Sequence, residues 1–174
     1  GSHAVPPLVC NIEQRLAHIR ALGIDICIVQ ALEAPFSQFG PAEYVQEVLC
    51  ALPATHVVVG REFTFGRNRS GNIHLLKELA PPKGITIEHL KTVADGEQAI
   101  SSSHIRELVL NGRIEMAERL LGHPFLLQGR VVPGQQRGRQ LGFPTANLAV
   151  DGLLTPPSGV YAALAHTADG RQYA

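Results

Sequence analysis

The chain has 174 residues, which is enough for one ordinary domain or for one domain and part of another. Apolar residues make up 45% of it and charged residues 17%, a composition typical of a globular protein and not of a disordered one. Lysine plus arginine equals aspartate plus glutamate, at 15 each, so the chain lacks the positive charge that attracts duplex nucleic acid. We therefore expect no nucleic-acid partner.

Cysteine content and hydropathy bear on the compartment. The three cysteines, Cys10, Cys27 and Cys50, are odd in number and show no CxxC spacing. This pattern predicts buried, reduced thiols in a reducing compartment, which here means the cytoplasm. No apolar run reaches the length of a membrane span, so no membrane partner is expected.

Helix and strand patterns alternate through the first two thirds of the chain. The spacing predicts a helix over residues 11–22, with Asn11 and Gln14 forming a capping box and Ile12, Leu16, Ile19 and Leu22 on its apolar face. Gly23 ends that helix. The later predicted elements are a buried strand at 24–30, a helix from Pro41 with an apolar stripe of Val45, Val48, Leu49 and Leu52, a strand at 56–60, a helix at 73–80 and a strand at 85–90. Such alternation is typical of βαβ units around a parallel sheet.

The pattern changes near Gly122–Pro124. Two helices are predicted over 101–112 and 113–122, each ending at a glycine. Residues 123–174 then show glycine and proline punctuation with short alternating runs, which indicate antiparallel strands or a barrel. We therefore divide the chain into residues 4–122 and 123–174, although the second part is short for an independent core.

The segment GREFTFGRNRSG, residues 60–71, is the first candidate binding site. An extended backbone places Phe63 and Phe65 on one side, next to arginines and glycines. Such a surface suits a planar aromatic ligand that carries phosphate. The alternative is a strand end with core phenylalanines and a solvated basic loop.

The segment ISSSHIR, residues 100–106, places three hydroxyl groups at the start of a predicted helix. Helix N-termini bind phosphate through free N–H groups, and Arg106 on the first turn could reach the same anion. The alternative is ordinary capping by Ser102 or Ser103, with Arg106 in solvent.

The segment PGQQRGRQLGFPTANL, residues 133–148, carries the strongest signal. Glycines 134, 138 and 142 allow a loop to pass close to a ligand, and two arginines offer charge to phosphate. Thr145 and Asn147 would present two oxygens on one face of an extended backbone, and Mg²⁺ prefers such hard ligands. The alternative is a hairpin turn with a polar strand face.

Taken in chain order, these segments resemble the bifunctional riboflavin kinase/FMN adenylyltransferases, the prokaryotic FAD synthetases. The resemblance rests on VVVGREFTFGRNRSG, ISSSHIR, AERLLGHPF, GRVVPGQQRGRQLGFPTANL and LLTPPSGVYA, and it runs from about Pro7 to the last residue. It implies an α/β fold, in which a Rossmann-like nucleotidyltransferase module with a parallel sheet precedes the start of a β-barrel riboflavin kinase module.

The resemblance also implies substrates and residue roles. The substrates would be riboflavin, FMN and ATP, with FAD as the product and Mg²⁺ in both steps. The implied nucleotide-binding residues are Ser101, Ser102, Ser103, Arg106, Gly134, Gly138, Arg139 and Pro144. The implied flavin-binding residues are Gly60, Glu62, Phe63 and Phe65, and the implied metal ligands are Thr145 and Asn147.

The sequence departs from the family pattern in three places. Neither the HxGH motif of the adenylyltransferase nor the downstream carboxylate of the kinase occurs in the 174 residues, and Glu62 stands where aspartate is usual. The catalytic residues are therefore not assigned, and we expect this length of chain to turn over little. Two alternatives stay open: a non-catalytic module that binds flavin or nucleotide, and a nucleotidyltransferase with another acceptor.

Overall fold

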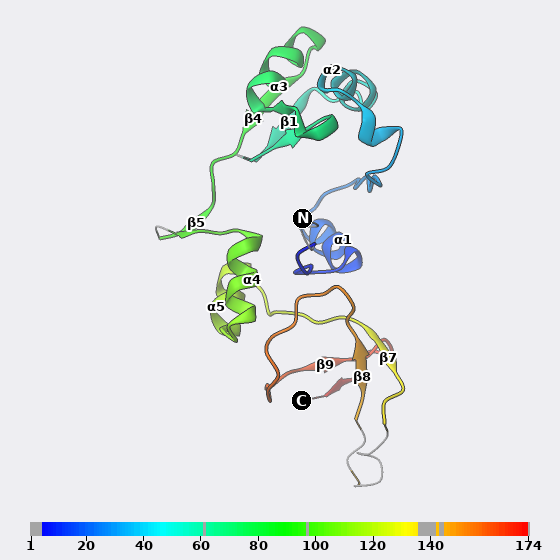
Figure 1. Ribbon diagram of the computed structural model, residues 1–174, viewed down its shortest axis with the longest axis vertical. Helices are drawn as coiled ribbons and strands as arrows, with labels where there is room; N and C mark the ends of the chain where they lie inside the picture. Colours follow the sequence, from blue (N-terminus) through cyan, green and yellow to red (C-terminus); the bar gives the residue numbers. More distant parts are fainter. Residues whose placement is uncertain (1–4, 61, 97, 136–141, 143–144, 174) are drawn as a thin grey trace. The chain divides into compact units, whose positions relative to one another are not determined.

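The structure is a computed structural model that describes residues 5–60, 62–96, 98–135, 142 and 145–173 (Figure 1). It contains two compact units. One consists of residues 25–100, and the other of residues 1–24 together with residues 101–174. The division of the chain between residues 122 and 123 stays a prediction.

The unit of residues 25–100 is built on a pair of parallel strands. β1 (His56–Val59) pairs with β4 (Thr86–His89), and His56 lies opposite Thr86. Helix α3 (Ile73–Leu79) lies between them in sequence and contacts β4. The predictions of strands at 56–60 and 85–90 and of the helix at 73–80 are therefore confirmed.

One core cluster holds this unit together. Its buried members come from β1, β2 (Thr64–Phe65), α3, the helix after Pro41 and the chain entering β4. They are Val45, Val59, Phe65, Leu76, Ala80 and Ile85. Figure 1 shows α2 (Pro41–Tyr44) and α3 beside the β1–β4 pair. Burial of such side chains stabilises a fold by about 1.5–3 kcal/mol each, so this cluster keeps the two strands and their helices together.

The helix predicted from Pro41 forms, but its shape changes along its length. α2 (Pro41–Tyr44) is α-helical, and a π-helical turn, η2 (Val45–Leu49), follows directly. Val45 is 2% exposed and belongs to the core, whereas Leu52 is 48% exposed and lies beyond the helix. The wider turn of a π-helix changes the angular spacing of side chains, so the predicted stripe ends before Leu52.

The strand predicted over residues 24–30 was wrong. These residues form no strand in the structure, and Ile26, Ile28 and Val29 are 79%, 62% and 61% exposed. A β-branched run becomes a strand only when a neighbouring strand accepts its hydrogen bonds. In the described part of the chain β1 pairs with β4, and residues 24–30 join neither of them. The expected parallel sheet is thus reduced to two strands.

Several short elements complete this unit. They are η1 (Phe36–Gln38), β2 (Thr64–Phe65), η3 (Arg67–Arg69), β3 (Gly71–Asn72), η4 (Pro81–Lys83), β5 (Ala94–Asp95) and β6 (Gln98–Ala99). The antiparallel pairs are β2 with β3 and β5 with β6.

The second unit is built around two helices. α4 (Ser102–Leu110) and α5 (Ile114–Leu121) confirm the two predicted helices, and Gly122 ends α5 in the left-handed conformation. The core between them consists of Ile105, Leu108, Val109, Ala117 and Leu154. Leu154 is the member of this cluster that comes from the C-terminal part of the chain, and it is 1% exposed.

The N-terminal segment holds Leu154 in place. The Leu8 N–H donates to the Gly152 carbonyl, and the Leu154 N–H donates to the Leu8 carbonyl, both at 2.8 Å. These bonds form an isolated parallel bridge between Leu8 and Leu153. The chain before the first helix is therefore tied to the turn that follows residue 151.

The first helix, α1 (Ile12–Ala21), has the predicted capping box but a different buried face. The Gln14 N–H donates to Asn11 Oδ1 at 2.8 Å, and the Asn11 N–H donates to Gln14 Oε1 at 2.7 Å. Gln14 is 4% exposed, whereas Ile12 is 49% exposed. The reason is a third bond, because Gln14 Nε2 donates to the Leu126 carbonyl at 2.9 Å and docks the helix on the chain after α5.

The C-terminal part forms two antiparallel pairs. β7 (Arg130–Val132) pairs with β8 (Asn147–Ala149), and β9 (Ala165–His166) pairs with β10 (Gln172–Tyr173). Within the described residues these pairs do not form a barrel, so the expected start of a barrel is not seen there and the fold is mixed α/β.

Two expectations from composition can be compared with the structure. No helix in the described ranges is long and apolar enough to cross a membrane. All three cysteines are free, but Cys27 is exposed and the other two are half-buried, so the prediction of buried thiols was wrong. Cys27 is exposed because it lies in the run 24–30 that finds no strand partner.

Gly71 should be sensitive to substitution. A Cβ atom at Gly71 would lie 2.7 Å from the Phe65 ring, although the backbone there is not left-handed. Gly71→Ala should therefore lower the free energy of unfolding by about 1–3 kcal/mol, the usual penalty of overpacking. Gly60→Ala is the control, because nothing lies within 4 Å of its Cβ position. Equal unfolding free energies for the two variants in urea titrations would contradict this packing.

The same core predicts a pH dependence. Tyr44 packs 5.2 Å from the Phe65 ring, and burial raises the pKa of Tyr44 above its ordinary value of 10.0. The folded state disfavours the phenolate, so this contribution to stability is complete below pH 10.0 and is lost as pH rises through the folded pKa. Between about pH 9 and about pH 11, the free energy of unfolding should fall more for the wild type than for Tyr44→Phe. Identical losses in the two proteins would refute this assignment.

Candidate functional site

The N-terminus of α4 carries the candidate phosphate motif. Ser101 is the N-cap, and its Oγ accepts from the His104 N–H at 3.2 Å. Ser102 and Ser103 are the first helical residues and are exposed. The cap is therefore Ser101 and not Ser102 or Ser103. The other two hydroxyl groups lie at the positive end of the helix dipole, where an anion is stabilised.

Arg106 does not project freely into solvent. Its Nε–H donates to the Pro7 carbonyl at 2.7 Å, and the side chain is partly buried. The alternative of a solvated Arg106 was therefore wrong. This bond engages the Nε–H, and a guanidinium carries further N–H donors on its terminal nitrogens. Arg106 thus anchors the N-terminal segment on α4, one helical turn closer to the C-terminus of the helix than the serine hydroxyls.

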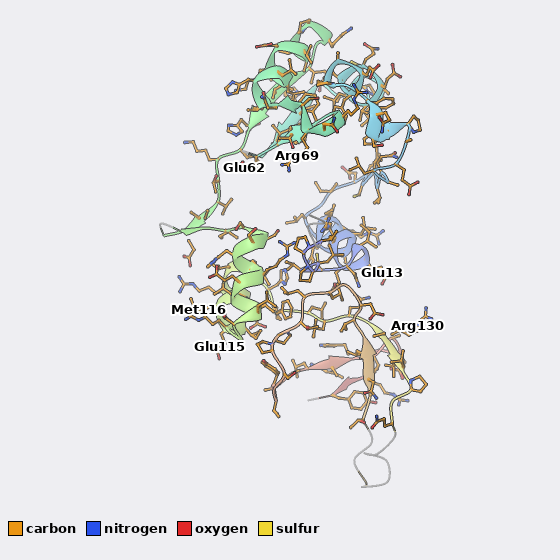
Figure 2. All side chains as sticks on the ribbon, viewed as in Figure 1. Glu13, Glu62, Arg69, Glu115, Met116 and Arg130 are labelled. Atoms are coloured by element: carbon orange, nitrogen blue, oxygen red, sulfur yellow. The ribbon has the colours of Figure 1, made fainter. Side chains whose placement is uncertain are left out.

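The candidate flavin segment begins where β1 ends. Gly60 follows the strand and is exposed, and Glu62, labelled in Figure 2, is exposed as well. The rings of Phe63 and Phe65 stack, with centroids 5.6 Å apart and planes 17° apart, as expected if both lie on one side of the backbone. Phe65 is 5% exposed and belongs to the core, whereas Phe63 is only partly buried. Of the two rings, Phe63 is the one that a ligand can reach.

The basic loop after Phe65 is held by backbone and side-chain bonds. The Arg67 N–H donates to the Phe39 carbonyl at 2.7 Å, and Arg69 Nε donates to Thr64 Oγ1 at 3.0 Å. Asn68 and Arg69 have φ angles of 55° and 56°, in the left-handed region that non-glycine residues seldom adopt. Arg67 and Arg69 are nevertheless exposed, so their charge is available at the surface; Arg69 is labelled in Figure 2.

The β7–β8 pair carries the candidate magnesium ligands. Asn147 is the first residue of β8 and lies opposite Val132, and Thr145 precedes it by two residues. Both side chains are exposed. The Asn147 carboxamide lies against the backbone of Gly134, the first of the predicted loop glycines. The structure therefore brings together one predicted nucleotide-binding residue and one predicted metal ligand.

Three other predicted residues, Gly138, Arg139 and Pro144, lie outside the described residues. The flavin segment belongs to the unit of residues 25–100, and the phosphate and magnesium motifs belong to the other unit. Among the residues that the structure describes, no group of three or more His, Cys, Asp or Glu side chains could hold a metal ion. Magnesium does not require such a group, because it takes few protein ligands and completes its shell with waters and phosphates.

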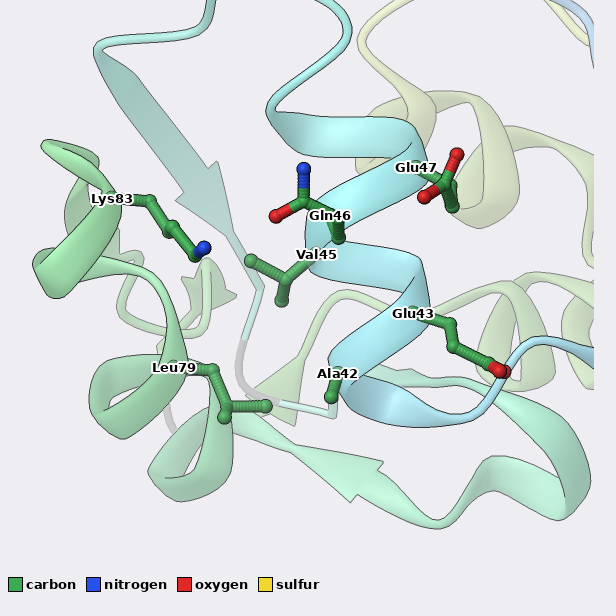
Figure 3. Close-up of a pocket in the computed structure, with 7 residues that line it drawn as sticks. All are labelled: Ala42, Glu43, Val45, Gln46, Glu47, Leu79 and Lys83. Atoms are coloured by element: carbon green, nitrogen blue, oxygen red, sulfur yellow. The ribbon is translucent and has the colours of Figure 1, made fainter.

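Two shallow grooves lie away from these motifs. The first, of about 360 Å³, separates η2 from the end of α3, and Figure 3 shows Lys83 and Leu79 on one side and Val45 and Gln46 on the other. The second, of about 520 Å³, lies between the chain around Leu8 and the β7–β8 pair. Neither groove is lined by a predicted site residue, so neither adds to the candidate site.

Sequence reasoning missed the partners of two candidate residues. Arg106 meets the carbonyl of Pro7, and Asn147 meets the backbone of Gly134. In both cases the partner is main chain, which every residue type carries. Gly134 gave an indirect signal, because a glycine permits close approach, but the sequence did not indicate what would approach.

Comparisons with known proteins place the chain in a family. A family profile described as FAD synthetase matches residues 2–104, and a second profile, described as riboflavin kinase, matches residues 121–174. The chain belongs to the FAD synthetase family. The resemblance inferred from the ordered motifs is thereby confirmed.

The curated relatives of this FAD synthetase family member carry one description, bifunctional riboflavin kinase/FMN adenylyltransferase. The Listeria monocytogenes protein is 37% identical over 153 residues, covering 87% of this chain and 48% of the relative. The Bacillus subtilis protein is 32% identical and the Escherichia coli protein 32% identical, covering 89% and 90% of this chain and 49% and 50% of those relatives. The chain thus spans about half the length of the relatives it matches.

A solved structure also resembles this chain. It is described as a macrolide-efflux protein from Streptococcus pneumoniae and is 27% identical, with a TM-score of 0.74. The match covers 95% of this chain and 58% of the pneumococcal one. The arrangement of helices and strands in this chain therefore has a counterpart in a crystal structure.

The bond between Arg106 and Pro7 can be tested without any ligand. Arg106→Met keeps the aliphatic stem but removes the charged donor, and it should lower the free energy of unfolding by about 1.5–3 kcal/mol. Arg106→Lys should restore little, because an ammonium lacks the Nε–H geometry. Hydrogen exchange at the Leu154 amide, which donates to the Leu8 carbonyl, should accelerate in both variants. Unchanged exchange and stability would show that Arg106 does not anchor the segment.

Proposed function

We propose that this chain takes part in FAD biosynthesis, as part of an enzyme that phosphorylates riboflavin to FMN and adenylylates FMN to FAD. The observation that carries the proposal is the succession of two family matches in one chain, FAD synthetase over 2–104 and riboflavin kinase over 121–174. The relatives with this order are described as bifunctional riboflavin kinase/FMN adenylyltransferases. We place the two domains at residues 4–122 and 123–174.

In the kinase step a riboflavin hydroxyl oxygen attacks the γ-phosphorus of ATP, and ADP leaves. In the adenylyl step an FMN phosphate oxygen attacks the α-phosphorus of a second ATP, and pyrophosphate leaves. Both reactions depend mainly on positioning and on stabilising negative charge. The chain's contribution to each step is therefore the placement of phosphates, metal and flavin.

Thr145 and Asn147 fit a magnesium ion in the kinase part. They offer a hydroxyl and an amide oxygen, both exposed, with Asn147 at the start of β8 and Thr145 two residues before it. Magnesium accepts such hard oxygens and takes its other ligands from waters and nucleotide phosphates, whose charge it neutralises. We propose that the nucleotide lies along Gly134, Gly138, Arg139 and Pro144.

In the adenylyltransferase part the residues divide between two places. Ser101, Ser102, Ser103 and Arg106 at the start of α4 would bind the phosphates of the second ATP through the helix dipole and charged donors. Gly60, Glu62, Phe63 and Phe65 would face the flavin, with Phe63 providing the accessible ring. We also propose a cytoplasmic location, which the three free cysteines support.

Ligand binding by the 174-residue chain tests this proposal. Calorimetric titration with Mg²⁺ and ADP should show binding that Thr145→Ala/Asn147→Ala weakens at least about tenfold, because each charge-assisted contact contributes about 1.5–3 kcal/mol. Thr155→Ala removes another exposed hydroxyl of the same unit and should leave the affinity unchanged. Quenching of FMN fluorescence tests the flavin segment separately.

The outcomes separate the proposal from its rivals. Binding without riboflavin phosphorylation, in the full-length protein as well as in this chain, would favour a non-catalytic binding module. Nucleotide binding without FMN quenching would favour a nucleotidyltransferase with another acceptor. Affinity for ADP that is the same with and without Mg²⁺ would refute the magnesium site.

A further inference from the structure

The side chain of Asn147 lies so close to Gly134 that it overlaps the position of a Cβ atom on residue 134. A Cβ atom placed on Gly134 would lie 2.1 Å from Asn147 Nδ2, 2.8 Å from Cγ and 3.1 Å from Oδ1. Real Cβ atoms do not approach other heavy atoms to within 3.0 Å. The carboxamide of Asn147 therefore occupies the space that any side chain at residue 134 would need.

The requirement for glycine at this position is one of space and not of backbone conformation. Gly142 and Gly152 have φ angles of 82° and 73°, in the left-handed region that favours glycine. Gly134 is not in that region, so its backbone is one that alanine can adopt. The obstacle to a larger residue at 134 is the side chain of Asn147, and a side chain can be removed by mutation.

The strand register explains why these residues meet. Val132 lies opposite Asn147 in the antiparallel β7–β8 pair. Extended by two residues beyond the paired strands, that register would set Gly134 opposite Thr145, and opposite residues of an antiparallel pair share a face. The missing side chain of Gly134 would then be on the face that carries both proposed magnesium ligands. Asn147 is its diagonal neighbour and fills the gap.

We propose that Gly134 is a positioning residue for Asn147, an inference that rests on the proposed magnesium-nucleotide site. The absent Cβ leaves the space that the Asn147 carboxamide occupies, so the place of this proposed ligand group is set before the ligand arrives. A methyl group at 134 displaces the carboxamide without changing the backbone.

A double-mutant cycle isolates this contact. Gly134→Ala should reduce the folding equilibrium constant by no more than about 5-fold, the low end of the overpacking range, because the obstructing atoms are the end of an exposed side chain that can turn away. In an Asn147→Ala background the same substitution should have no such effect, because the obstacle is gone. The Nδ2 resonances of Asn147 in the free protein should shift in Gly134→Ala, and the affinity for ADP with Mg²⁺ should fall at least about tenfold.

Gly129→Ala is the matched control. Its Cβ atom would lie 2.2 Å from the Ala149 carbonyl oxygen, which is main chain, so Asn147→Ala cannot relieve it. Additive effects of Gly134→Ala and Asn147→Ala, or unmoved Asn147 resonances, overturn the proposal. If Gly134→Ala does not fold, folding of the double variant supports the proposal, and failure of both overturns it.

The two proposals fail in distinguishable ways. The unfolding and resonance measurements need neither metal nor nucleotide, so they decide whether Gly134 positions Asn147. The titration with ADP and Mg²⁺ decides whether that position serves a metal. A wild-type chain that shows no magnesium-dependent binding would overturn the proposed function, while the positioning contact would still be decided by the cycle.

Discussion

The close approach of β7 and β8 is the constraint on which the candidate kinase site depends. Glycines at both ends of β7 make it possible: Gly129 leaves room for the Ala149 carbonyl, and Gly134 leaves room for the Asn147 carboxamide. Between them, three residue pairs set the register. Because side chains alternate along an extended chain, Thr145 and Asn147 would share a face where β8 is continued by two residues toward Thr145. The two glycines thus help to place the proposed ligands because neither has a side chain to hold the strands apart.

Among the described residues of the C-terminal part, Leu154 is the one fully buried in a core cluster, and the other buried members of that cluster are on α4 and α5. The bridge between Leu8 and Leu153, together with the bond from Arg106 to Pro7, ties the same turn to the N-terminal segment. A short β segment buries too little apolar surface to be stable alone, and here it packs against the helical scaffold of α4 and α5. The proposed phosphate and magnesium motifs consequently share that scaffold.

Local signals predicted the helices and both strands of the parallel pair. The capping box of Asn11 and Gln14, and the glycines that end α1, α4 and α5, were readable because they depend on residues a few positions apart. The strand at 24–30 was not, because a strand needs a partner from elsewhere in the chain. The burial of Gln14 escaped notice for the same reason, since the Leu126 carbonyl that satisfies it lies 112 residues away.

In the candidate flavin segment, core packing is compatible with the proposed ligand binding. Phe65 packs between Tyr44 and Phe63, and Gly71 leaves the space for its ring. Because Phe65 is fixed from several sides, the ring stacked on it is held in one orientation as well. A binding surface gains affinity when its groups are ordered before the ligand arrives. The buried phenylalanine therefore supports the candidate site by holding Phe63, the ring that the segment leaves accessible.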